Sequence, residues 1–307
     1  MQRLTITHVT TYRYRTPVRF GEHRLMFRPR DSHDLRLTDT ALTISPQARV
    51  RWLHDVFGNS VAIARFGEDS ADLLRFESRF SVEHFARPEP VFDVEDRARH
   101  LPFAYGADEV PDLGRTLERH VADPDHAVDA WTRQFLGQNG PVRTIDVLAA
   151  MARAIHADFT YQTRYEPGVQ APHETLAKGR GTCRDFALLF MEAARSLGIA
   201  ARFVSGYVYD PALDGAAGGN GQPALAGSGS THAWAQVYLP GAGWIEFDPT
   251  NGIIGGANLI RVAVARDPSQ AIPLQGTFIG PGDAFIAMDV SVAVTADPGD
   301  NGHREVA

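Results

Sequence analysis

Apolar and polar side chains alternate in short runs along the first 85 residues. In residues 2–16, every second side chain from Leu4 to Tyr14 falls on one face of an extended strand, and Pro17 ends the run. Turn-forming residues separate this run from four more, at residues 36–44, 50–56, 60–66 and 73–85. This punctuation predicts an antiparallel β-sandwich over residues 1–85. The segment carries no catalytic cluster, so we expect it to act as a scaffold or to form one wall of a cleft.

The pattern becomes helical in the middle of the chain. Residues 86–125 predict a linker region of loops with one short helix near residues 113–120. Apolar side chains then recur at three- and four-residue steps, which predicts helices over residues 127–136 and 144–157, the second capped by Thr144. Residues 172–178 predict a short turn that leads into the next helix.

That next helix carries the only cysteine of the protein, Cys183, in its first turn. Thr182 and Asp185 have the spacing of a capping box, in which the two side chains satisfy free backbone N–H groups. An apolar stripe follows from Phe186, and Gly198 ends the helix. A glycine-broken loop running into a capped helix therefore places Cys183 at a helix N-terminus.

Strands dominate again after the Cys183 helix. We expect them at residues 199–209, 231–239, 244–248, 259–265 and 287–295. Residues 210–230 are rich in Gly, Ala and Ser, which predicts a mobile loop that gates the site. The chain then divides into a β domain (1–85), a linker region (86–125), a catalytic core (126–270) and a C-terminal strand and tail (271–307), and its fold class is α+β.

Composition narrows the classes of function. A length of 307 residues, 44% hydrophobic and 22% charged, is typical of a globular protein of about two domains. One cysteine excludes an internal disulfide and a multi-cysteine zinc site, and we expect no metal and no cofactor. The net charge of −7 disfavours nucleic acid and anionic membrane as partners. Without an apolar leader or an 18-residue apolar run, we expect a cytoplasmic protein; its oligomeric state stays open.

A lone cysteine is most often a small buried hydrophobe, but its position here favours chemistry. Unpaired N–H groups and the positive end of the helix dipole favour a thiolate at a helix start. A thiol nucleophile also needs a base and a group that orients the base. The hairpin of the last strands offers His232 and Asp248, and a five-residue loop at Leu239–Gly243 would place Asp248 diagonally from His232.

The residues around this constellation resemble the bacterial transglutaminase-like superfamily, a group of candidate cysteine proteases. The likeness lies in Gly-Arg-Gly-Thr-Cys-Arg-Asp-Phe-Ala around Cys183, Thr-His-Ala-Trp-Ala around His232 and Gly-Trp-Ile-Glu-Phe-Asp-Pro-Thr around Asp248. The N-terminal region is similar to the β domain of that family, through the run from His8 to Tyr14 and the motif Asp55-x-x-Gly-Asn. The resemblance implies a papain-like core with Cys183 as nucleophile, His232 as base and Asp248 as the orienting acid.

Such a site predicts acyl transfer from a peptide or protein amide through a thioester. Water as acceptor gives a peptidase or amidase, which we favour; an amine gives a transglutaminase. An N-acetyltransferase that takes acyl-CoA and a catalytically silent binding module are further alternatives. The Cys183 N–H is one expected oxyanion donor, and the candidates for a second are Tyr161, Gln162 and Trp234. Capping and solvated turns account for Asp185 and Glu174 as well as a catalytic role does.

Overall fold

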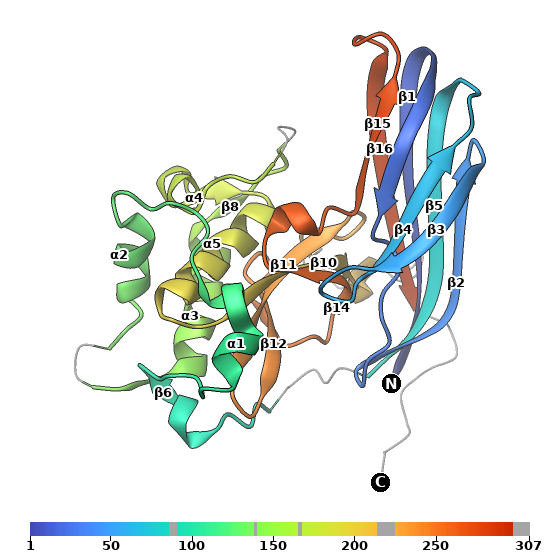
Figure 1. The fold of residues 1–307 in the computed structure, drawn as a ribbon. Helices are drawn as coiled ribbons and strands as arrows, with labels where there is room; N and C mark the ends of the chain where they lie inside the picture. Colours follow the sequence, from blue (N-terminus) through green and yellow to red (C-terminus); the bar gives the residue numbers. More distant parts are fainter. Residues whose placement is uncertain (86–90, 138–139, 165–167, 214–224, 297–307) are drawn as a thin grey trace.

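The computed structural model describes residues 1–85, 91–137, 140–164, 168–213 and 225–296. Long β strands stand on one side of the molecule and a helical region on the other, with a smaller sheet between them (Figure 1). The predicted α+β class is confirmed, with a mostly β, nearly closed N-terminal region and a core of helices and strands. Within the described residues, no helix combines the length and apolar character needed to cross a membrane.

The N-terminal region is a seven-stranded antiparallel sheet built around one long strand, β1. The first half of β1 pairs with β5 and β16, and its second half pairs with β4 and β15. A strand that switches partners along its length lets the sheet curl toward closure. The strands are β1 (Gln2–Leu25), β2 (Leu35–Ser45), β3 (Ala48–His54), β4 (Ser60–Phe66), β5 (Ala71–His84), β15 (Leu274–Ile279) and β16 (Phe285–Ala296).

The two last strands change the domain division expected from the sequence. β15 and β16 do not follow the catalytic core as an appended strand and tail; they return to the N-terminal region and flank β1. Alternation within residues 285–296 predicts a strand but holds no information on its partner, because register over long sequence separations depends on tertiary packing. The N-terminal β region is therefore completed by the C-terminal part of the chain.

The second sheet has five antiparallel strands in the order β13-β12-β11-β10-β14. Its strands are β10 (Ala201–Val208), β11 (His232–Leu239), β12 (Gly243–Asp248), β13 (Ile253–Ile254) and β14 (Leu259–Ala265). The helices that pack beside it are α1 (Glu109–Leu113), α2 (Ala127–Arg133), α3 (Thr144–Asp158), α4 (Pro172–Lys178) and α5 (Cys183–Ser196). Short pieces connect them: β6 (His100–Leu101), β7 (Val142–Arg143), β8 (Thr160–Tyr161), β9 (Arg180–Gly181), η1 (Asp96–Ala98), η2 (Gly114–Leu117), η3 (Pro211–Leu213) and η4 (Pro268–Gln270).

Some local expectations differ from the structure in detail. The short helix expected near residues 113–120 lies earlier, as α1 and the 3₁₀ turn η2, and residues 172–178 form the helix α4 rather than a turn. Thr144 does not cap α3; it is the first helical residue, and its hydroxyl donates to the carbonyl of Ala98 at 2.6 Å. Boundaries of short elements depend on contacts distant in the sequence, which local patterns do not contain.

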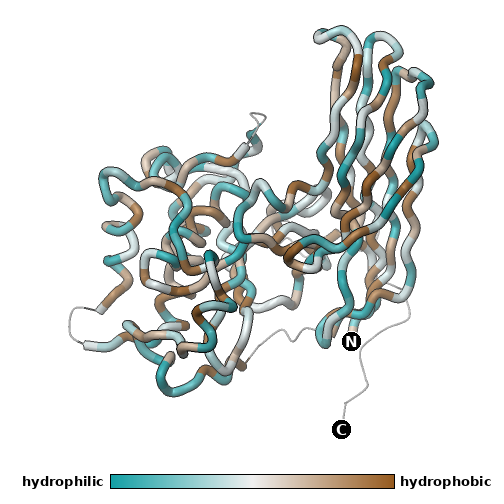
Figure 2. The backbone as a smooth tube through the Cα atoms, viewed as in Figure 1, coloured by the Kyte–Doolittle hydropathy of each residue, from teal (hydrophilic) through white to brown (hydrophobic). Residues whose placement is uncertain are grey.

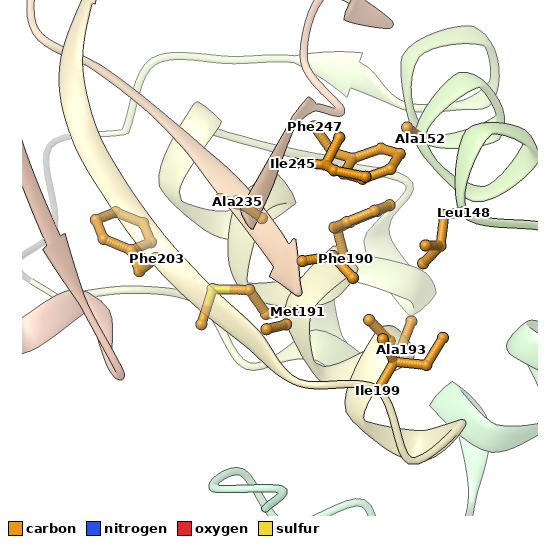
Figure 3. Close-up of a cluster of buried hydrophobic side chains, with 14 of the residues drawn as sticks. Leu148, Ala152, Phe190, Met191, Ala193, Ile199, Phe203, Ala235, Ile245 and Phe247 are labelled. Carbon is orange, nitrogen blue, oxygen red and sulfur yellow. The ribbon is translucent and has the colours of Figure 1, made fainter. Parts of the chain in front are cut away.

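Helix α5 forms the centre of the catalytic core. It packs against β10 and β11, and the ring of Phe190 stacks on Phe247 of β12 with centroids 5.1 Å apart (Figure 3). Leu148 and Ala152 of α3 join the same buried cluster. Hydrophobic residues gather along the inner segments of this region, and hydrophilic ones occur mainly along the outer loops (Figure 2). The buried stripe of α5 therefore holds its first residue, Cys183, in a fixed position.

The β region docks directly on the second sheet through the turn between β3 and β4. The amide of Asn59 bonds the edge strand β14: its Nδ2 donates to the Val264 carbonyl at 2.7 Å, and its Oδ1 accepts from the Val264 N–H at 2.9 Å. Asp55 holds Asn59 in place, because it accepts from both the backbone and the side chain of that residue. The motif Asp55-x-x-Gly-Asn thus joins the two sheets and caps a sheet edge.

A second contact between the sheets is the buried His8 of β1. One ring nitrogen, Nδ1, lies 2.7 Å from the Tyr207 hydroxyl of β10, and Nε2 lies 2.9 Å from the Thr10 hydroxyl. Apolar side chains of both sheets, including Ile6 and Ile260, form one cluster around it. The β region is consequently not a separate scaffold, because its core is shared with the catalytic sheet.

We predict that His8 makes the stability of the protein fall at mildly acidic pH. Burial lowers the pKa of His8 from 6.5 to about 4, so between these values the unfolded chain takes up a proton that the folded chain does not. The stabilisation is present above pH 6.5 and is lost as pH falls toward 4. Urea unfolding of the wild type and of His8→Gln at pH 7.5 and pH 5 measures it. The wild type is expected to lose about 2 kcal/mol more than the variant, and equal losses would contradict the assignment.

Candidate active site

The loop before α5 is built to present Cys183. Thr182 is the N-cap; its hydroxyl accepts from the Asp185 N–H, and the Asp185 carboxylate accepts from the Thr182 N–H at 2.9 Å. The predicted capping box is confirmed, and Cys183 is the first residue of the helix. Its N–H has no carbonyl partner within the helix, as expected for a first-turn residue. Cys183 is a buried residue with 7% of its surface exposed.

Asp185 stabilises the loop. Its side chain is fully buried, and its Oδ1 accepts from the Gln170 N–H at 2.7 Å and from Arg164 Nη2 at 3.2 Å. Its Oδ2 accepts from both the backbone and the hydroxyl of Thr182. A carboxylate whose oxygens already accept from this many donors is not available to a substrate. Glu174, the other carboxylate noted in the sequence, forms a half-exposed ion pair with Lys178.

The hairpin of β11 and β12 brings His232 and Asp248 together in the register predicted from its loop. Tyr238 pairs with Trp244 and Ala235 with Phe247, so Asp248 lies opposite Trp234 and diagonal to His232. Nε2 of His232 is 2.8 Å from Oδ2 of Asp248, and both side chains are fully buried. The second oxygen of Asp248 accepts from the Thr250 N–H at 2.9 Å, which fixes the carboxylate plane.

Charge and burial act in opposite directions on this pair. Burial favours the neutral imidazole, but the Asp248 carboxylate and the nearby Cys183 thiol raise the pKa of His232 well above its ordinary value. Burial likewise acts against the charged form of Asp248, yet His232, Asn251 and the Thr250 N–H together lower the pKa of that carboxyl. The arrangement favours an imidazolium that interacts with the Asp248 carboxylate and also with the Cys183 thiol.

Trp234, two residues after His232 on the same face of β11, supports the imidazole from one side. The two rings stack with centroids 5.9 Å apart, and the indole N–H donates to the buried carboxylate of Glu246. Gly206 of β10 makes room for this indole, because a Cβ at that position would lie 2.7 Å from Trp234 Cη2. Since its N–H is already engaged, Trp234 positions His232 and is not an oxyanion donor.

Of the other two suggested donors, the structure favours Tyr161. The backbone N–H of Gln162 donates to the Gly181 carbonyl at 2.9 Å, and its exposed position gives it no evident place in the site. Tyr161 is 39% exposed, and burial together with the charges of Cys183 and Asp248 raises its pKa to about 12. The phenol therefore keeps its proton at neutral pH.

Asn251 is a site residue that the sequence reasoning missed. Its Nδ2 donates to Asp248 Oδ2 at 2.8 Å and to the Ala226 carbonyl at 3.1 Å, and its Oδ1 accepts from the Ala226 N–H at 2.9 Å. One side chain thus joins the carboxylate to the end of the preceding loop. One sequence signal could have indicated it: Asn251 lies three residues after Asp248, and an Asn side chain in a turn often bonds to a residue just before it.

Residues 225–230, the described end of the expected gating loop, pack on His232. Gly227 has φ +91°, and a Cβ there would lie 2.3 Å from Nδ1 of His232, so only glycine admits this approach. The carbonyl of Gly229 accepts from the Val292 N–H of β16, which links the segment to the β region. Residues 214–224 lie outside the described part of the chain, so gating by this loop stays a prediction.

The side chains that meet around Cys183 determine which chemistry the site can support. Among the residues that the structure describes, no group of three His, Cys, Asp or Glu side chains is arranged to hold a metal ion. The groups that meet here are one thiol, one imidazole, one carboxylate and a helix N-terminus. This set suits nucleophilic attack by sulfur on a carbonyl, with proton transfer by the imidazole.

Comparison with known families agrees with both halves of the structure. Residues 129–249 match the model of the transglutaminase-like superfamily, a span that holds Cys183, His232 and Asp248. Residues 4–83 match the bacterial transglutaminase-like N-terminal region. The chain thus contains a transglutaminase-like core and a bacterial transglutaminase-like N-terminal region. The resemblance found in its sequence is thereby confirmed, and it extends over both the β region and the catalytic core.

Several proteins are similar to this transglutaminase-like chain along most of its length. The Mycobacterium tuberculosis protein Rv2569c is 29% identical over 98% of this chain and 95% of its own. YebA of Bacillus subtilis is 35% identical over 54% of this chain but only 20% of YebA. The crystal structure of a candidate cysteine protease from Cytophaga hutchinsonii, 19% identical, superposes over 100% of this chain and 94% of that one with a TM-score of 0.69. That similarity establishes a shared fold.

We predict that Asn251→Ala releases the segment at Ala226 while the protein stays folded. The substitution removes three hydrogen bonds, one of them to a buried carboxylate, and should lower the free energy of unfolding by about 1–3 kcal/mol. Hydrogen exchange at the Ala226 amide should become markedly faster. Asn258→Ala is a matched control, because it removes an amide bond to the Tyr209 carbonyl and touches neither Ala226 nor Asp248. Unchanged exchange at Ala226 in the Asn251 variant would contradict this role.

Proposed function

We propose that this chain is a cysteine-nucleophile acyl-transfer enzyme that acts on peptide or side-chain amides through a thioester. Cys183 is the nucleophile, His232 the base and Asp248 the group that orients the base. Hydrolysis is the favoured outcome, which makes it a peptidase or amidase. The match to the transglutaminase-like superfamily and the fold shared with a candidate cysteine protease support an enzyme of this kind.

One observation carries the proposal: His232 lies between a carboxylate and the only thiol of the protein. Its Nε2 is engaged by Asp248 at 2.8 Å, and the proximity of Cys183 contributes to its raised pKa. Nδ1 is buried and has no fully formed hydrogen bond among the described residues, so it is the nitrogen left to take the thiol proton. A carboxylate on Nε2 fixes the tautomer in which Nδ1 can accept that proton.

The acylation step follows from these positions. The Cys183 sulfur attacks the amide carbonyl carbon, and its proton is held by His232. The tetrahedral intermediate collapses as the C–N bond breaks, and His232 gives its proton to the leaving amine. The product is a thioester between the substrate acyl group and Sγ. Asp248 remains an anion throughout and stabilises the imidazolium.

The oxyanion of the intermediate has donors at the helix start. The N–H of Cys183 belongs to the first turn of α5, where the helix dipole also favours negative charge. Tyr161 supplies the second donor in this proposal, since its phenol interacts electrostatically with Cys183 and keeps its proton.

The molecule that attacks the thioester in the second step decides whether the enzyme is a hydrolase or a transglutaminase. Water that attacks the thioester releases an acid, whereas an amine gives a new amide and a transglutaminase. Either acceptor loses a proton to His232, and Sγ leaves as the thiolate. We favour water, because it is always present and an amine acceptor must exclude it from the thioester.

We predict that the reactivity of Cys183 depends on His232 and Asp248. Iodoacetamide labels a single site, since the protein has one cysteine, so the rate of labelling reports the thiolate directly. At pH 6.5, His232→Ala should label about ten-fold more slowly than the wild type, because the imidazolium no longer stabilises the thiolate. Asp248→Asn should show a smaller decrease, and Cys183→Ala should not label.

The same variants should separate in turnover of a peptide amide. Cys183→Ala abolishes it, His232→Ala loses about 10²–10⁴-fold, and Asp248→Asn loses less while circular dichroism shows an intact fold. Glu174→Gln, which removes a surface ion-pair partner, is the control and should behave as the wild type. Turnover that survives in Cys183→Ala would refute the proposal.

We predict that hydrolysis continues when an amine competes for the thioester. A peptide amide is incubated with the enzyme in the presence and absence of a millimolar primary amine, and mass spectrometry identifies the products. Release of the free acid under both conditions supports a peptidase or amidase. If the amine is incorporated and almost no acid forms, the enzyme is a transglutaminase and water is the wrong acceptor.

A further inference from the structure

A second concave site lies on the opposite side of the catalytic sheet from helix α5. It is a pocket of about 720 Å³ between the β region and strands β12 and β14. This volume is within the range of small-molecule sites in proteins. His232, Cys183 and Asp248 do not line it, so it is distinct from the candidate active site. Its lining includes three arginines, Arg30, Arg202 and Arg261.

Arg202 of β10 is held in a fixed orientation at this pocket. Its guanidinium stacks on the Trp244 ring at 4.0 Å from the ring centroid. Its Nε donates to Oε1 of Gln236 at 2.6 Å, and Nε2 of Gln236 in turn donates to Glu246 at 2.6 Å. With Nε engaged and the plane fixed by stacking, the two Nη groups form a fork that is prepared for a planar anion.

The carboxylates described around Arg202 form no ion pair with it. Arg261 forms ion pairs with Glu246 at 2.6 Å and with Asp34 at 3.2 Å, so these two carboxylates already have a cation. Asp31 accepts from the Leu37 N–H. Among the described residues, neither Arg202 nor Arg30 forms an ion pair, and the one hydrogen bond of the Arg30 guanidinium goes to the Phe57 carbonyl at 3.2 Å.

The same imbalance appears in the titration of Arg202. Burial lowers its pKa to about 10; Arg261 and Arg30 add to the effect, and Glu246 opposes it. A lowered arginine pKa indicates a cation whose hydration is lost without full replacement by protein anions. An anion bound at the fork would supply that missing interaction.

We propose that this pocket binds a ligand whose carboxylate group is attached to an apolar body. The carboxylate takes both Nη groups of Arg202, and Arg30 lies near enough to add a second positive charge. Phe57, Phe92 and Val262 line the pocket and provide apolar contact for the rest of the ligand. A phosphate fits less well, because its second negative charge would face Asp34 and Glu246.

Glu246 lines the pocket and also holds Trp234, which packs on His232. Glu246 accepts hydrogen bonds from Gln236 and Arg261 on the pocket side and from the indole of Trp234 on the other. Trp234 stacks on His232. The proposal of a carboxylate site does not depend on the proposed enzyme activity, and its test measures binding alone.

The test is calorimetric titration of the full chain with 3-phenylpropionate, 3-phenylpropanamide and inorganic phosphate. The acid should bind with a dissociation constant of about 1 mM or tighter, and the amide should not bind. Arg202→Gln should weaken binding of the acid at least about ten-fold. The affinity of Arg202→Lys should fall between those of the wild type and Arg202→Gln, because lysine keeps the charge but lacks the two Nη groups. Arg153→Gln, an exposed change on α3 away from the pocket, should bind as the wild type does.

Two further arms keep the outcome decisive. If Arg202→Gln fails to fold, Arg30→Gln on the exposed rim replaces it and should weaken binding of the acid several-fold. A short peptide ending in Phe, with a free or an amidated C-terminus, distinguishes a free acid from a polypeptide terminus as the natural source. Equal binding of acid and amide, undiminished binding by a folded Arg202→Gln, binding of phosphate alone, or no saturable binding of the acid would each overturn the proposal.

Discussion

The structure of the catalytic core depends on keeping a charged pair, His232 and Asp248, in the protein interior. Removing two charges from water costs several kcal/mol for each ion, and their attraction offsets this only if the remaining hydrogen-bonding positions are filled. The core fills those of the carboxylate. Asp248 accepts from the Thr250 and Asn251 backbone and from the Asn251 amide, and the imidazole is covered by Trp234. The short turn after β12 is therefore as much a part of the site as the pair itself.

The β region contacts the sheet that carries His232 at two places. The residues by which its sequence resembles the family, His8 and the Asp55–Asn59 turn, prove to be contacts with the catalytic sheet: His8 meets Tyr207 on β10, and Asn59 bonds the backbone of β14. Both strands belong to the same sheet as β11, which carries His232. The β region thus contacts the edge strand β14 and the neighbouring strand β10, and β10 pairs with the strand that carries His232.

Much of the fold and of the candidate site could be predicted from local sequence. The capping box places Cys183, and loop length with strand alternation sets the diagonal of His232 and Asp248; both depend on residues close in the chain. The pairing of β15 and β16 with β1 could not be predicted, because their partners lie 249 to 292 residues away and many registers bury the same alternating face. Asn251 was missed for a related reason: two of its three side-chain bonds go to Ala226, which lies 25 residues earlier in the chain.

The polar face of the catalytic sheet connects these observations. On β11 and β12, side chains alternate between the apolar core around α5 and the opposite face, so His232, Trp234 and Gln236 must share one side with Glu246 and Asp248. A sheet face that carries a catalytic base cannot be covered by an apolar layer without leaving these groups unsatisfied. Arg261 forms an ion pair with Glu246 on this face, and Asp34 of the β region forms a second ion pair with Arg261. Arg202 lies on this same face and forms no ion pair among the residues that the structure describes. Its position follows from the same alternation that positions His232.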